Sequence, residues 1–120
     1  MQVVFIIGRI LLGGYFLYSG FNHFANMRGM TAYSKMKGVP AAKAAVVVSG
    51  IMLALGGVAV LFNKFAILGM ALVVIFLIPT TLMMHRFWKE TDPHARMSER
   101  INFTKNIALM GALLLLISIA

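Results

Sequence analysis

Polar side chains that could bind a ligand lie close to the ends of long apolar runs. Asn22 and His23 close the first run, His85 closes the third, and Lys105 and Asn106 open the fourth. These groups donate or accept hydrogen bonds, and the charge of a histidine changes near neutral pH. Antiparallel runs would bring these ends to one membrane level, so the pattern predicts a pocket for the head of a quinone or an anionic lipid. The alternative is that the residues only finish helices in the hydrated headgroup region.

Arg9 is a second candidate because it is the one charge placed well inside an apolar run. A charge there costs at least about 2.5 to 3.5 kcal/mol on insertion scales. The predicted spans contain no Asp or Glu. Three partners therefore stay open: the C-terminal carboxylate of Ala120, a lipid phosphate reached by snorkelling, or an anionic or carbonyl-bearing ligand.

Metal, haem and thiol chemistry are poorly supported. The chain has no cysteine, which removes thiol redox relays and thiolate metal sites. His23 and His85 are a weak signal for haem, and the residues from His85 to His94 show no recognised ligand spacing, so we expect no metal site. The cofactor is left open, with a quinone as one candidate. No nucleophile with its base and no paired carboxylates are visible, so the sequence does not decide whether the protein is an enzyme.

The elements that must position these residues are membrane helices. Of the 120 residues, 61% are hydrophobic and 12% are charged, whereas soluble domains contain about 45–50% apolar and about 25% charged residues. A span needs about 20 apolar residues, and four runs approach or reach that length, at about residues 3–24, 42–62, 65–85 and 103–120. We therefore predict an all-α fold, an integral membrane four-helix bundle formed by a single transmembrane domain over residues 1–120.

The loops predict how this bundle sits in its membrane. Cations concentrate in the loops that follow the first and third runs, while the opposite side offers only Lys64. Basic loops stay in the cytoplasm, so both termini are predicted to be periplasmic in a bacterial cytoplasmic (inner) membrane. Methionines and a tyrosine recur every third residue from Met27 to Met36, which predicts a short interfacial helix. The formal charge of +8 then favours anionic lipid headgroups over nucleic acid as a partner.

Glycines within the spans predict close helix packing. Gly56 and Gly57 in the second run should lie against another helix, because small residues allow backbones to approach closely in lipid.

Several short motifs stand in an order that resembles the DoxX family. They are Arg9–Ile–Leu–Leu–Gly13, Ser19–Gly20 with His23, Gly38–Val–Pro40, Gly56–Gly57, His85–Arg–Phe–Trp88 and Asn102–Phe–Thr–Lys–Asn106. The resemblance covers nearly the whole chain and implies a small four-helix membrane protein. Relatives are subunits of a thiosulfate-oxidising, quinone-reducing enzyme or partners of redox and oxidative-stress complexes. The resemblance also implies that four residues occupy positions marked by the family's pattern: Arg9, His85, Lys105 and Asn106.

One departure from the family concerns an acidic residue. Many relatives carry a glutamate shortly before the glycine pair, where this chain has Met52–Leu53–Ala54–Leu55. A function that depends on that acid, including proton coupling, is therefore in doubt.

Three functions remain open. The leading hypothesis is an accessory membrane subunit of a redox or respiratory assembly that binds a quinone or lipid head near the cytoplasmic face. The alternatives are a small homo-oligomeric transporter with Arg9 as its binding charge, and a purely structural membrane scaffold. The partner subunit and the oligomeric state do not follow from the sequence.

Overall fold

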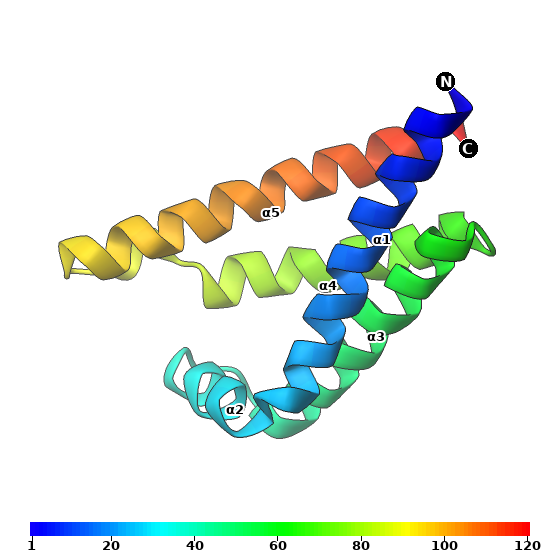
Figure 1. The fold of residues 1–120 in the computed structure, drawn as a ribbon. Coiled ribbons are helices and arrows are strands. Elements are labelled where there is room, and N and C mark those ends of the chain that lie inside the picture. Colours follow the sequence, from blue (N-terminus) through cyan, green and yellow to red (C-terminus); the bar gives the residue numbers. More distant parts are fainter.

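The chain is all-helical, and the computed structural model describes residues 1–120 (Figure 1). Its elements are α1 (Gln2–Ala25), α2 (Met27–Met36), α3 (Ala42–Phe62), α4 (Ala66–Met84), the short 3-10 helix η1 (Phe87–Lys89) and α5 (Pro93–Ile119). By length and composition, 4 helices could cross a membrane: α1, α3, the segment that contains α4, and α5. The predicted helical membrane bundle and the short helix after the first span are confirmed.

The last helix differs most from the prediction, because it begins at Pro93 and not near Phe103. Asp92 caps it: the backbone N–H of Ala95 donates to the Asp92 carboxylate at 3.0 Å. Pro93 occupies the first turn, where its missing N–H costs nothing. The predicted span from about residue 103 contains no acid, but the longer helix α5 also includes Glu99.

Glycines join α1 to α3. A Cβ atom on Gly20 would lie 2.8 Å from the carbonyl oxygen of Gly50. A Cβ atom on Gly13 would likewise lie 2.8 Å from the carbonyl oxygen of Gly57. The two backbones are thus too close to leave room for side chains. This confirms the predicted packing of Gly57.

The neighbouring glycine of α3, Gly56, packs against α4 on the other side of the helix. A Cβ on Gly56 would lie 2.5 Å from Cγ2 of Val73 and 2.8 Å from the carbonyl oxygen of Gly69, both in α4. Consecutive residues of a helix point about 100° apart, so Gly56 and Gly57 can contact different partners. The predicted packing of Gly56 is confirmed as well, and α3 lies between α1 and α4.

The helices form an open arrangement rather than a closed ring. Helix α3 packs against α1, α4 and α2, while α5 packs against α4 and η1; α1 and α5 are not a packed pair. The N- and C-termini lie at the same end of the molecule, and α2 lies at the other (Figure 1). The most deeply buried side chains are Phe16, Leu53, Val73, Thr81 and Leu113. Toward α2, the pair α1–α3 diverges from the pair α4–α5 (Figure 1).

Candidate functional site

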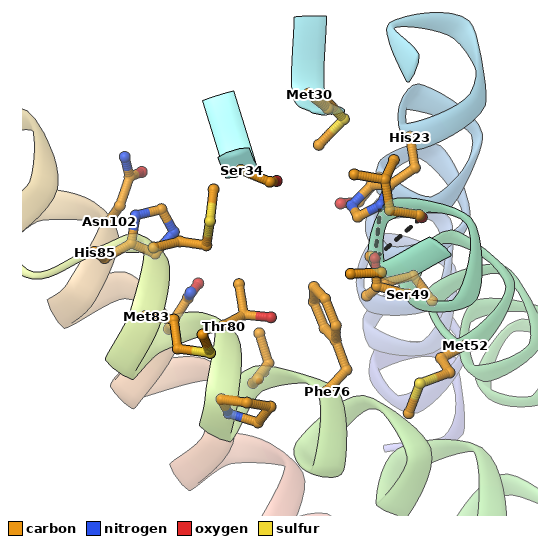
Figure 2. A pocket seen from close by; sticks show the side chains of 18 of the residues that line it. His23, Met30, Ser34, Ser49, Met52, Phe76, Thr80, Met83, His85 and Asn102 are labelled. Atoms are coloured by element: carbon orange, nitrogen blue, oxygen red, sulfur yellow. Dashed lines mark hydrogen bonds between the residues drawn. The ribbon is translucent and has the colours of Figure 1, made fainter. Parts of the chain in front are cut away.

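A cavity of about 540 Å³ lies between the two diverging helix pairs. Most of its lining residues are hydrophobic, and α2 contributes Met30, Tyr33 and Ser34. Its polar lining residues come from five helices and their ends: Tyr15, Ser19, His23, Tyr33, Ser34, Ser49, Thr80, His85, Asn102, Lys105 and Asn106. Figure 2 shows His23 and Ser49 on one side of the cavity, and His85 and Asn102 on the other.

On the first side, His23 is fixed by helix α3. Its Nδ1 lies 3.1 Å from the carbonyl oxygen of Val46 and 3.0 Å from the hydroxyl oxygen of Ser49. The Ser49 hydroxyl donates to the same Val46 carbonyl at 3.1 Å. The ring of Phe76 meets the imidazole edge to face, with centroids 6.0 Å apart. These contacts fix the ring's orientation, and no protein group bonds Nε2.

On the second side, His85 is fixed by Glu99. The His85 Nδ1 lies 3.3 Å from Oε1 of Glu99. Glu99 is only 4% exposed, so its carboxylate needs several partners to offset the loss of water. Its other oxygen accepts a hydrogen bond from the Tyr33 hydroxyl at 2.9 Å and lies 2.7 Å from Nζ of Lys37. Three side chains, two from α2 and its C-terminal end and one from the C-terminal end of α4, thus satisfy one buried carboxylate.

The contacts of Tyr33 and Lys37 tie α2 to the α4–α5 pair. Lys37 also lies 2.7 Å from Oε1 of Glu90, and its carbonyl accepts a hydrogen bond from Arg86 at 2.8 Å. We call Tyr33, Lys37, His85, Glu90 and Glu99 the clasp. Helix α2 packs on α3 and α1 but not on α4 or α5, so the clasp and the Arg86 bond are what join it to the α4–α5 pair.

The clasp also changes the pKa values of Tyr33 and Lys37, the two groups that come from α2 and its C-terminal end. Burial lowers the pKa of Lys37, but hydrogen bonds to Glu90 and Glu99 outweigh it, and the net pKa lies well above the usual value. The pKa of Tyr33 is raised, first by burial and then by its hydrogen bond to the Glu99 carboxylate and that group's negative charge. Both groups therefore keep their protons throughout the physiological range.

Helix α5 supplies further polar groups to the cavity. Asn106 is 5% exposed, lines the cavity and has no hydrogen-bond partner in the protein. Lys105 makes no ion pair; its Nζ lies 6.0 Å from the centroid of the Tyr15 ring on α1, across the gap between α1 and α5. Buried amides usually find a partner, so Asn106 is suited to bind a group that enters the cavity.

Four of the residues predicted from the sequence line this single cavity: His23, His85, Lys105 and Asn106. Asn22 does not. Its side chain accepts a hydrogen bond from the Asn26 side chain one turn later. Neighbouring positions of a helix point in different directions, so Asn22 cannot share the orientation of His23.

Arg9 does not line the cavity and lies in the first half of α1. Its guanidinium stands over the ring of Phe5, 5.4 Å from the centroid, and its buried Nε has no partner. Arg9 forms no ion pair with the Ala120 carboxylate, so this one of its three predicted partners is not found in the structure.

Sequence reasoning missed Glu99, Tyr33 and Lys37. The spacing of Glu99, Asn102 and Asn106, at i, i+3 and i+7, places them on one face of a helix and could have revealed the first. Tyr33 and Lys37 are likewise four residues apart. The charged residues before Phe103 are typical of a solvated loop, which hides this helical spacing.

The comparison with protein families finds a match over part of the chain. The model of the DoxX family matches residues 4–86, which include Arg9, His23 and His85. The match is shorter than the resemblance seen in the sequence, and it leaves Glu99, Lys105 and Asn106 outside. No curated protein and no solved structure matches the chain. With four helices suited to a membrane and a family match over most of its length, the chain is a multi-pass membrane protein of the DoxX family.

Proposed function

We propose that the cavity binds the oxygen-bearing head of an amphipathic molecule, with a quinone head as the leading candidate. The observation that carries the proposal is the pairing of mainly apolar walls with polar groups that lack protein partners, above all Asn106. Ligand sites in proteins combine an apolar lining with a few placed polar groups in this way.

The lining favours a flat, neutral head over a phosphate. Tyr15, Phe16 and Phe76 offer aromatic faces or edges to a ring. Lys105 is a cation at the cavity that no acid neutralises, and Glu99 behind His85 is already paired with Lys37, so charge alone does not disfavour an anion. A lipid phosphate is the weaker ligand because most of the lining is apolar and aromatic.

On this basis we propose an accessory role in a redox or respiratory assembly of the bacterial inner membrane. The chain has no cysteine and therefore no thiol relay of its own. Electrons for a bound quinone would then come from a partner subunit. The basic loops support a cytoplasmic location for the α2 end, with both termini in the periplasm.

Ligand occupancy tests the proposal. The protein is purified in nanodiscs of its own host lipids, and retained small molecules are identified by native mass spectrometry. We expect a bound quinone, with occupancy reduced several-fold in Lys105→Ala at an unchanged melting temperature. His85→Ala should reduce occupancy as well, measured at a temperature where this variant is folded, because His85 also bonds the buried Glu99. Lys89→Ala is the matched control, because Lys89 is exposed and makes no ion pair. Unchanged occupancy in both site variants would overturn the proposal.

A small homo-oligomeric transporter is the second candidate, and Glu99 favours it. Proton-coupled transport needs an acid within the membrane domain, and α5 supplies a buried one. Proteoliposomes loaded with a pH-sensitive dye provide the test. Transport predicts proton uptake, driven by a membrane potential, that is lost in Glu99→Gln; an accessory ligand-binding subunit predicts none.

A further inference from the structure

Each histidine of the cavity uses one ring nitrogen to bond the protein and leaves the other without a protein partner. His23 and His85 lie on opposite sides of the cavity (Figure 2). Both use Nδ1 for the protein contact. Which nitrogen carries the proton then decides whether the cavity offers donors or acceptors to a ligand.

For His23 the proton lies on Nδ1. The Val46 carbonyl, 3.1 Å away, can only accept a hydrogen bond. The Ser49 hydroxyl donates its own proton to that carbonyl, so its oxygen is free to accept from Nδ1 as well. The neutral ring therefore presents Nε2 as a lone pair.

For His85 the same tautomer follows from Glu99. The carboxylate that faces Nδ1 at 3.3 Å also accepts from Tyr33 and pairs with Lys37, which keeps it ionised and acceptor-only. Nδ1 must carry the proton, and Nε2 of the neutral ring is again a lone pair. A carboxylate behind a histidine sets its tautomer in the same way in many sites.

We propose that the cavity selects the dihydroxy, reduced form of a quinone-type head over the oxidised dicarbonyl form. This inference rests on the proposed function. Hydroxyl groups at the two ends of the head would donate to Nε2 of His23 and of His85. A carbonyl oxygen in the same place would face a lone pair and leave each acceptor unpaired, which costs roughly tenfold in affinity for each histidine.

The other polar groups do not reverse this preference. Lys105 donates hydrogen bonds. The other polar lining groups both donate and accept: the amides of Asn102 and Asn106 and the hydroxyls of Ser19, Ser34 and Thr80. The oxygen of a hydroxyl and the oxygen of a carbonyl can each accept from them. The two histidines alone distinguish the two forms.

Three probes test the inference on the full-length protein in nanodiscs. They are decylhydroquinone under anaerobic conditions, its dimethyl ether and decylquinone, each incorporated at the same mole fraction at about pH 8, where an ordinary histidine is neutral. Native mass spectrometry measures the ligand bound per protein. We expect decylhydroquinone to bind at least tenfold more tightly than either other probe. Equal or tighter binding of decylquinone would overturn the inference and leave the proposed function standing, whereas no binding of any probe would overturn the proposed function itself.

Glu99→Gln tests the tautomer directly. A glutamine amide can donate to Nδ1, which permits the proton on Nε2 and turns that nitrogen into a donor for a carbonyl. The preference for decylhydroquinone should then fall about tenfold. Glu90→Gln is the matched control: it also removes a carboxylate from Lys37 but does not touch His85, so the preference should persist.

His85→Phe covers the case in which Glu99→Gln does not fold. It removes the same lone pair while leaving Glu99 bonded to Tyr33 and Lys37. Each single variant, His85→Phe or His23→Phe, should lower the preference about tenfold, and an undiminished preference in both folded variants would contradict the inference.

Discussion

Gly13 of α1 and Gly57 of α3 occupy each other's side-chain space. A Cβ on Gly13 would lie 2.8 Å from the carbonyl oxygen of Gly57, and a Cβ on Gly57 would lie 2.7 Å from the carbonyl oxygen of Gly13. Backbone atoms cannot rotate away as a side chain can. The distance between α1 and α3, which form one wall of the cavity, therefore depends on these two glycines.

The first prediction is that Gly13→Ala destabilises the protein in detergent by about 1–3 kcal/mol, the usual cost of overpacking. The control is the next residue: a Cβ on Gly14 would meet nothing within 4 Å. Gly14→Ala should be neutral or slightly stabilising, because alanine favours helix. The measurement is the melting temperature of both variants, and equal values would contradict the α1–α3 contact.

The second prediction concerns the burial of the Glu99 carboxylate. Glu99→Ala leaves Lys37, His85 and Tyr33 without their shared acceptor, which typically costs about 3–5 kcal/mol for a buried pair. Glu90→Ala should cost no more than about 1 kcal/mol, because the Glu90 side chain is 29% exposed and water can replace it at Lys37. Chemical denaturation in mixed micelles would compare the two. A smaller loss in Glu99→Ala than in Glu90→Ala would refute the role given to the clasp.

The third prediction follows from the raised pKa values of Tyr33 and Lys37. Between the unfolded and folded pKa of each group, the folded state holds more protons than the unfolded state. Stability is therefore full below about pH 10 and falls as pH rises above it. The melting temperature should decline in this range, and less steeply in Tyr33→Phe and Lys37→Met. Lys35→Met is the control, since Lys35 is exposed and unpaired; the same flattening there would contradict the assignment.

The fourth prediction is the topology, with the α2 end in the cytoplasm. Cysteines at Lys35 and Ser98 should resist an impermeant thiol reagent in intact cells, while a cysteine at Asn63 should react. All three positions are exposed, whereas the neighbouring Ser34 lines the cavity and is buried. The opposite labelling pattern would place the cavity on the periplasmic side.

Local sequence determined the elements of this protein. Apolar runs of membrane length can satisfy their backbone only as helices, so the four long helices were predictable from composition and spacing. The close packing of Gly56 and Gly57 in α3 was predictable for a separate reason: small side chains within membrane helices indicate close approach of helix backbones. The ends of these runs also indicated His23, His85, Lys105 and Asn106 as one group.

Only the tertiary structure decided how the site is built. Glu99 lies in a charged segment that reads as a solvated loop, and its burial depends on Tyr33 and Lys37, which are distant in sequence. The tautomer of His23 depends on a backbone carbonyl of α3, which carries no sequence signal. Asn22 and His23 are adjacent and both polar, yet only His23 reaches the cavity. Such contacts depend on how helices are rotated against one another, and packing between distant residues sets that rotation.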